Sequence, residues 1–195
     1  AKEKSVCAIV DFGVAPGIPN LLAGHHTKLM KVNSYKCCVG GLPVERKYPW
    51  QYKAPFSPAD VLEEYTRPAR MIENGRLVTK EALSDPEYIN FEGIGTLEAF
   101  NTDGLRSLIK TTSIPNMTEK TLRYPGHIDF IRALRDTGFL DDKTIDINGQ
   151  SAAPLDFTSK LLFEAWKLKP KEEEFTVMKI IFEGEEDGIN RRYTY

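Results

Sequence analysis

The chain has 195 residues, 41% of them hydrophobic, which is enough to bury the core of one domain. Its 26 basic and 28 acidic residues give a net charge of −2, which argues against nucleic acid as a partner because no basic surface is expected. No apolar run approaches membrane-spanning length, so we expect no membrane partner and a cytoplasmic location.

The cysteines and histidines do not form a metal-binding pattern. Cys7, Cys37 and Cys38 are odd in number and two are adjacent, so neither a disulfide framework nor a zinc site is predicted. We expect all three to be buried thiols in apolar strands. His25 and His26 are neighbours on an expected helix, about 100° apart, and cannot easily share one metal ion.

The N-terminal segment predicts a strand, a turn and a helix. An apolar run from Val6 to Val10 ends in the glycine- and proline-rich turn 11–17, and a helix follows from about Ile18 to Met30. Its expected buried stripe consists of Ile18, Leu21, Leu22, His25 and Leu29. Because a helix N-terminus has unpaired N–H groups and partial positive charge, the turn is either an anion site or an ordinary strand–helix connection.

The next segments predict a strand, a short helix and a hairpin. A strand over Val32–Val39 leads into Gly40-Gly41, where missing side chains allow a ligand to approach the backbone. Ser57 and the proline after it predict the start of a helix that ends before Pro68. Asn74-Gly75 lies between apolar pairs, which is the signal for a β-hairpin.

Residues 88–100 predict one long strand, with a bulge or bend at Gly93 and Gly95. One face of this strand is apolar. The other carries Asn90, Glu92, Thr96 and Glu98. This polar face either meets water, lines a cleft or packs on a second copy of the chain.

The C-terminal half predicts alternating helices and strands. Asp103 is expected to cap a short helix that ends near Lys110. A strand at 120–123 turns into a helix that Gly138 ends, and a third amphipathic helix covers about 155–166. A strand at 175–182, a solvated turn at 183–188 and a last strand complete the chain. Strands outnumber long helices, so we expect an α+β fold with a mixed, largely antiparallel sheet and helices on one face.

Five segments occur in an order typical of one family. They are the turn at 11–17, Gly40-Gly41-Leu42-Pro43, and the stretches 97–106, 120–127 and 133–139. Together they resemble the saccharopine dehydrogenase family, and within it the lysine 6-dehydrogenase-like branch more than the saccharopine-forming reductases. The fold that this resemblance implies is the second domain of saccharopine and dihydrodipicolinate-type dehydrogenases.

Members of that family carry an N-terminal Rossmann domain, whose phosphate-binding turn is Gly-x-Gly-x-x-Gly. The nearest candidate here, Gly93-Ile94-Gly95, has Glu98 in place of the third glycine. We therefore expect a fragment. Residues 1–12 would be the terminal strand and junction of a missing Rossmann domain, and 13–195 a substrate-binding and dimerisation domain truncated at its C-terminus.

The resemblance implies the substrate-binding domain of an NAD(P)-dependent amino-acid dehydrogenase, acting on the C–N bond of lysine or a lysine-derived secondary amine. The cofactor, NAD or NADP, would be bound mainly by the missing domain, and the parent enzyme would be a homodimer. The fragment alone is expected to be inactive. The competing hypothesis is a non-catalytic binding or dimerisation domain that keeps the family fold.

The resemblance also implies site residues. The cofactor's nicotinamide end would meet Gly13, Val14, Ala15, Pro16 and Gly17, and the substrate pocket would be lined by Gly40, Gly41, Arg123 and Tyr124. Arg123 would grip a substrate carboxylate, or be a surface arginine stacked on Tyr124. His127 would act as a general base near the amine, or be a capping or solvated histidine. Glu92 and Glu98 are more typical of a wet or partner-facing surface than of an ammonium site.

Overall fold

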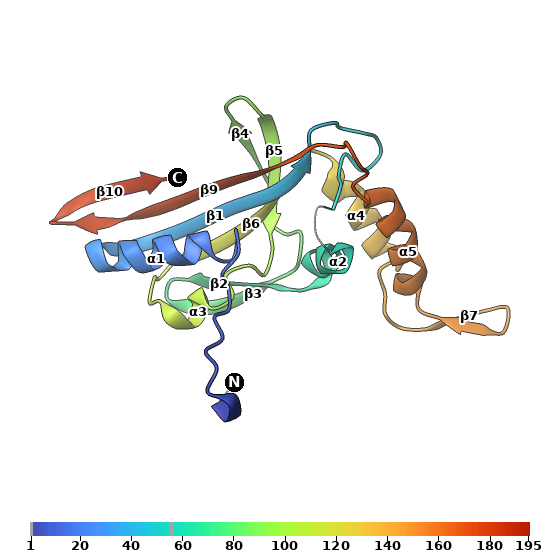
Figure 1. Cartoon of the computed structure of the whole chain (residues 1–195), viewed down its shortest axis with the longest axis horizontal. Helices are drawn as coiled ribbons and strands as arrows, with labels where there is room; N and C mark the ends of the chain where they lie inside the picture. Colours follow the sequence, from blue (N-terminus) through green and yellow to red (C-terminus); the bar gives the residue numbers. More distant parts are fainter. Residues whose placement is uncertain (1, 55–56) are drawn as a thin grey trace.

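The computed structural model describes residues 2–54 and 57–195 and contains one eight-stranded sheet (Figure 1). Its central strands are β9 (Glu174–Glu186), β1 (Lys31–Pro43) and β6 (Met117–Arg123), in that order. Strands β1 and β6 are parallel, whereas the other pairs are antiparallel. The predicted α+β class with a mixed, largely antiparallel sheet is confirmed.

The remaining strands extend the sheet as hairpins. Strand β10 (Ile189–Thr194) pairs with β9 at one edge, and β2 (Ala69–Glu73) and β3 (Arg76–Lys80) form the other edge. The predicted turn Asn74-Gly75 joins β2 to β3, with positive φ at both residues, as a tight hairpin turn requires. A separate small hairpin, β7 (Ile145–Ile147) and β8 (Gln150–Ala152), was not predicted.

The predicted long strand at 88–100 is instead a hairpin. Strand β4 (Glu87–Phe91) turns back at Gly93 into β5 (Gly95–Asn101), which pairs with β6. Gly93 and Gly95 both adopt positive φ and allow the reversal. The single polar face predicted for this segment is therefore wrong: Glu98 is buried, while Thr96 is exposed.

Helix α1 (Ile18–Leu29) forms where predicted but buries a different face. Ala23 and His26 face the sheet, and the His26 ring stacks on Phe182 of β9 with ring centroids 4.5 Å apart. Leu21 and Leu29, predicted to be buried, are 62% and 53% exposed. His25 and Ile18 are exposed as well, and Leu22 is half-buried.

Residues 6–10 form no strand in this structure and are exposed, because no neighbouring strand in the described chain pairs with them. They follow a short 3₁₀ turn, η1 (Lys2–Lys4), and project from the body of the molecule (Figure 1). Cys7 is consequently exposed rather than buried, whereas Cys37 and Cys38 are buried as predicted.

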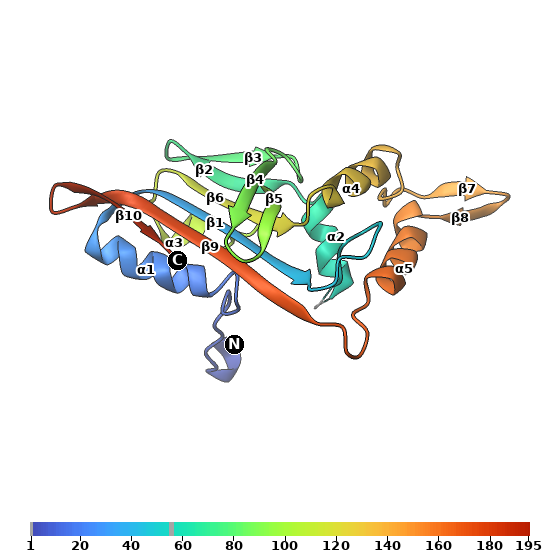
Figure 2. The same cartoon turned by 90° about the horizontal axis from the view of Figure 1, so that it is seen from above.

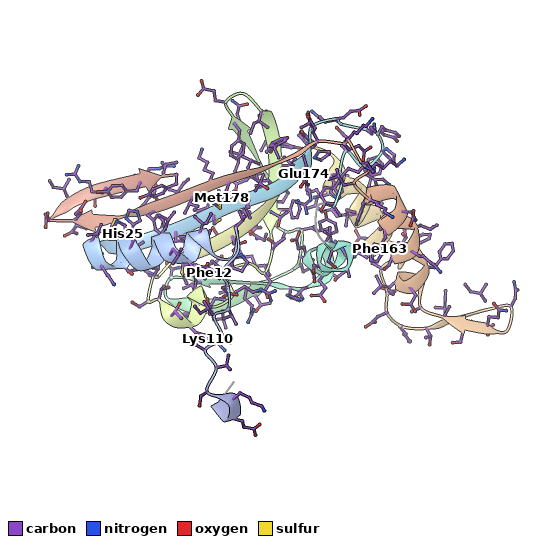
Figure 3. All side chains as sticks on the ribbon, viewed as in Figure 1. Phe12, His25, Lys110, Phe163, Glu174 and Met178 are labelled. Carbon is purple, nitrogen blue, oxygen red and sulfur yellow. The ribbon has the colours of Figure 1, made fainter. Side chains whose placement is uncertain are left out.

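The other helices gather at one end of the sheet (Figure 2). They are α2 (Pro58–Thr66), α4 (His127–Asp136) and α5 (Pro154–Trp166), and they share a core with aromatic residues of the preceding loops. Helix α3 (Leu108–Thr111) is shorter than the predicted helix and lies on the α1 face. Phe163 on α5 lies at this end of the molecule, and His25 on α1 lies far from it (Figure 3).

Side-chain alternation separates the two faces of the sheet. Cys37 and Met117 belong to the core beneath α1, whereas Cys38 and Leu122 belong to a cluster of strand residues on the opposite face. The face to which a β6 residue belongs therefore decides whether it can reach the space beside α1.

Candidate functional site

A cleft of about 270 Å³ lies on the α1 face of the sheet, between the turn before α1 and helix α2. Its walls are residues 14–16, residues 39–41 of β1, the loop 102–106, and parts of α2 and β6. Three segments selected from the sequence, namely the opening turn, Gly40-Gly41 and Arg123, thus meet at one place.

The opening turn is closed by its own hydrogen bonds. The N–H of Gly13 donates to the Pro16 carbonyl at 2.9 Å, and the N–H of Ile18 donates to the Gly13 carbonyl at 3.1 Å. The N–H of Gly17 donates to Asn20 Oδ1 at 3.1 Å. These three N–H groups already have acceptors, so they do not support the anion-site interpretation of the turn.

The apolar residues of this turn, rather than its glycines, face the cleft. Val14, Ala15 and Pro16 line it, whereas Gly13 and Gly17 do not. A Cβ at Gly17 would overlap the Gly13 backbone, so glycine is required there by the packing of the turn on itself.

Gly40 and Gly41 line the cleft from β1, and their predicted contact with a substrate stays a prediction. The reason for glycine at position 40 differs from the predicted one. A Cβ on Gly40 would overlap the backbone carbonyl of Leu122 on the neighbouring strand β6. Gly40 thus permits close β1–β6 pairing beneath the cleft.

Strand β6 contributes a row of three polar side chains. Glu119, Thr121 and Arg123 alternate along it and therefore share one face, and all three line the cleft. The Thr121 hydroxyl lies 2.9 Å from that of Thr102. With about 3.3 Å per residue, the Cα atoms of Glu119 and Arg123 are about 13 Å apart.

Arg123 is 2% exposed, so the alternative of a surface arginine is wrong. Its Nε donates to the Tyr65 hydroxyl at 3.0 Å, Nη1 to the Leu122 carbonyl at 2.9 Å, and Nη2 to Glu64 Oε2 at 3.1 Å. Its guanidinium stacks on Tyr52, 4.4 Å from the ring centre, rather than on Tyr124. A guanidinium has five N–H donors, and these three bonds leave two for a ligand.

His127 is fully buried and is not part of the cleft wall. Its Nδ1 lies 2.8 Å from the Trp50 carbonyl, which can only accept, so Nδ1 carries the proton. Nε2 therefore accepts from the Tyr65 hydroxyl at 2.9 Å, and that hydroxyl in turn accepts from Arg123. Burial, and then the nearby Arg123 charge, lower the pKa of His127 to about 3.

These contacts change the interpretation of His127. It is a neutral histidine that reaches the cleft only through Tyr65 and Arg123. It is neither solvated nor in contact with the cleft, and we assign it a positioning role rather than proton transfer with a ligand.

Tyr124 lies on the opposite face of the sheet from the cleft, as expected for the residue next to Arg123 in a strand-like segment. Its hydroxyl donates to the Pro43 carbonyl at 2.9 Å, and the Arg46 guanidinium lies 4.3 Å from its ring centre. The structure thus separates Tyr124 from the site that was predicted for it.

Asp103 lines the cleft but does not cap a helix. Its two carboxylate oxygens accept from Nε and Nη2 of Arg70, each at 2.8 Å. Its Oδ1 also accepts from the Arg70 backbone N–H at 3.1 Å. Asp103 therefore ties the loop that contains it to β2.

Glu119 is the cleft residue that sequence reasoning missed. It is 7% exposed, and within residues 2–54 and 57–195 its carboxylate has no hydrogen-bond or ion-pair partner. Burial, together with repulsion from Glu64, raises its pKa to about 8. The available signal was the alternation of Glu119, Thr121 and Arg123 along one strand.

Glu98 and Cys38 do not line the cleft. Glu98 is buried and accepts from the Gly126 N–H at 3.1 Å, outside the cleft. Burial raises the pKa of the Cys38 thiol to about 11, which disfavours a thiolate. No cluster of three or more potential metal ligands occurs among the described residues. No helix in that part of the chain is long and apolar enough to cross a membrane.

Comparison with known proteins identifies the family. The family model described as the saccharopine dehydrogenase C-terminal domain matches residues 13–195. The chain belongs to this family. Two curated relatives are NADP⁺-dependent, L-glutamate-forming saccharopine dehydrogenases: that of Schizosaccharomyces pombe is 30% identical over 72% of this chain, and that of Pyricularia oryzae 26% over 73%. The matched regions cover 34% and 35% of these relatives, so the chain spans about a third of their length.

A solved structure supports the same fold. Apo histidine-tagged saccharopine dehydrogenase (L-Glu forming) from Saccharomyces cerevisiae matches with a TM-score of 0.71 at 19% identity. The match covers 93% of this chain and 57% of that one. The saccharopine dehydrogenase family assignment thus agrees with the sequence resemblance.

Proposed function

We propose that this domain binds the substrate of an NAD(P)-dependent amino-acid dehydrogenase that acts on the C–N bond of lysine or a lysine-derived secondary amine. The observation that supports this most is the cleft itself. It places a buried guanidinium with two remaining donors beside an apolar turn and a glycine pair. The lysine 6-dehydrogenase type of activity is part of this proposal.

Arg123 would hold the substrate carboxylate. A planar guanidinium suits a carboxylate because two N–H donors can bind its two oxygens. Tyr65 and Glu64 already fix the orientation of Arg123, and His127 in turn fixes Tyr65. A ligand would therefore meet a group whose position does not depend on ligand binding.

The apolar side chains of Val14, Ala15 and Pro16 suit a nicotinamide ring better than a phosphate, and the N–H groups of Gly13, Gly17 and Ile18 in this turn already have acceptors. The cofactor's phosphates would be bound elsewhere in the enzyme. A nicotinamide bound there, of NAD or NADP, would supply the acceptor for hydride from the carbon that bears nitrogen. The residues of this domain would hold that carbon in position and keep water away.

Arg123→Lys in the enzyme that contains this domain tests the proposal. A lysine cannot reproduce the two-pronged contact, so kcat/KM for the amino acid should fall by about 10–150-fold, equivalent to about 1.5–3 kcal/mol for a hydrogen bond to a charged group. Cofactor affinity should not change.

Arg132→Lys is a matched control, since Arg132 donates to the Leu83 carbonyl from α4 and does not line the cleft. Urea unfolding of both variants separates misfolding from a binding defect. Unchanged kinetics for every candidate amino acid would remove Arg123 from the site.

The second candidate is a non-catalytic dimerisation domain. It is favoured by the exposed apolar side chains of Leu21 and Leu29 on α1, which face away from the sheet. The homodimer remains a proposal. The feature that favours it is the exposed apolar face of α1 rather than the polar strand expected at 88–100, because that segment is a hairpin.

A further inference from the structure

We propose that Glu119 is the amine-binding group of the cleft, and that the ligand is an amino acid with a second, cationic amine at the end opposite its carboxylate. This inference rests on the proposed function, since it takes Arg123 as the carboxylate-binding group. It adds the group that recognises the other end of the ligand.

Glu119 differs from Glu64 and Asp103 because, among the described residues, no cationic group lies within ion-pair distance of its carboxylate. Glu64 is paired with Arg123, and Asp103 with Arg70. The Glu119 carboxylate lines the cleft, is more than nine-tenths buried, and has no such partner within the part of the chain that the structure describes. A buried carboxylate without a partner is unfavourable when charged, and a ligand cation would supply the missing pair.

Gly104 shapes the surroundings of this carboxylate. A Cβ at Gly104 would overlap the Glu119 carboxylate, so the glycine backbone packs directly against it. This contact holds the carboxylate in place without offering it a side-chain donor. Burial, and then repulsion from Glu64, raise the pKa of Glu119 to about 8, while the positive charge of Arg106, which also lines the cleft, acts in the opposite direction.

The row on β6 matches a ligand with charged groups at two ends. Glu119 and Arg123 lie four residues apart on one face of the strand, and Thr121 lies between them. An acid at one end and a guanidinium at the other suit an amine and a carboxylate, respectively. The paired hydroxyls of Thr121 and Thr102 would contact the connecting part of the ligand.

NMR titration of the chain with three probes tests the inference. L-lysine carries both ionic ends, 1,5-diaminopentane carries only amines, and glutarate carries only carboxylates. Glu119→Gln should weaken the binding of lysine and diaminopentane by about tenfold or more, since a hydrogen bond to a charged group is lost. Glutarate affinity should stay the same or increase.

Glu98→Gln is the matched control, because Glu98 is an equally buried carboxylate on β5 that does not line the cleft. It should leave all three affinities unchanged. The carboxyl resonance of Glu119 gives a second readout: saturating diaminopentane should lower its pKa by stabilising the charged form.

The outcomes separate this inference from the proposed function. If Glu119→Gln leaves the affinities for lysine and diaminopentane unchanged, or if neither amine binds the unaltered chain, Glu119 is not the amine-binding group. If instead Arg123→Lys leaves lysine and glutarate binding unchanged, the carboxylate site is wrong, while the diaminopentane result still reports on Glu119 alone.

Discussion

Replacing Tyr65 with phenylalanine should destabilise the domain, because one buried hydroxyl joins Arg123 to His127. Tyr65 is fully buried, and its hydroxyl accepts from Arg123 Nε at 3.0 Å and donates to His127 Nε2 at 2.9 Å. Tyr65→Phe leaves a buried N–H and a buried ring nitrogen without this partner. At about 1–3 kcal/mol for each of these two unsatisfied groups, the free energy of unfolding should fall by about 2–6 kcal/mol.

Urea denaturation and calorimetry of the chain measure this loss. For a domain of this size, about 2–4 °C of Tm is lost per kcal/mol, so Tm should fall by roughly 4–24 °C. Tyr88→Phe is the control, since Tyr88 is 66% exposed, and a surface change of this kind costs about 0.5 kcal/mol or less. Equal effects of the two substitutions would refute the hydrogen-bonded chain from Arg123 to His127.

Three further predictions follow from particular contacts. Because the unfolded state protonates His127 at its ordinary pKa of 6.5 and the native state only near 3, its contribution to stability is present above pH 6.5 and lost as the pH falls below it. The stability of the native chain relative to His127→Gln should therefore decrease by about 1.4 kcal/mol per pH unit from pH 6.5 to 5, and a constant difference would contradict a buried neutral histidine. Gly40→Ala should lower the free energy of unfolding by about 1–3 kcal/mol, because the added Cβ would overlap the Leu122 carbonyl. Gly24→Ala is the control: its Cβ would meet open space on α1, and it should raise the free energy of unfolding by about 0.5–1 kcal/mol. Similar effects of the two substitutions in urea denaturation would contradict the close β1–β6 contact. Light scattering should show a dimer that Leu21→Glu on α1 converts to a monomer, and a monomeric unaltered chain would remove this face as a self-association surface.

Features with local causes were predicted well from the sequence. The hairpin at Asn74-Gly75 depends on two residues that tolerate positive φ. The end of α4 near Gly138, which has a φ of 84°, depends equally on one residue. Turn and cap chemistry acts within a few residues, so it can be recognised without knowing the rest of the fold.

The burial of particular side chains could not be predicted in this way. His25 and His26 are adjacent and chemically identical, and only the position of the sheet decides that His26 packs on Phe182. Residues 88–100 alternate as a strand should, yet the segment reverses at Gly93 because each half finds a strand partner. Alternation records which residues share a face, but it does not record where a strand ends.

The sequence by itself determined the family and the fold class. Only the tertiary structure decided that Glu119, Thr121 and Arg123 line one cleft, and which partners each of these side chains has there. Glu64 from α2 pairs with Arg123, whereas Glu119, beside Gly104, has no ion-pair partner among the described residues. The Tyr65 hydroxyl, which is hydrogen-bonded to His127, holds the Arg123 guanidinium in position. Burial and charge pairing arise between residues far apart in the chain, and those contacts exist only after the helices have packed against the end of the sheet.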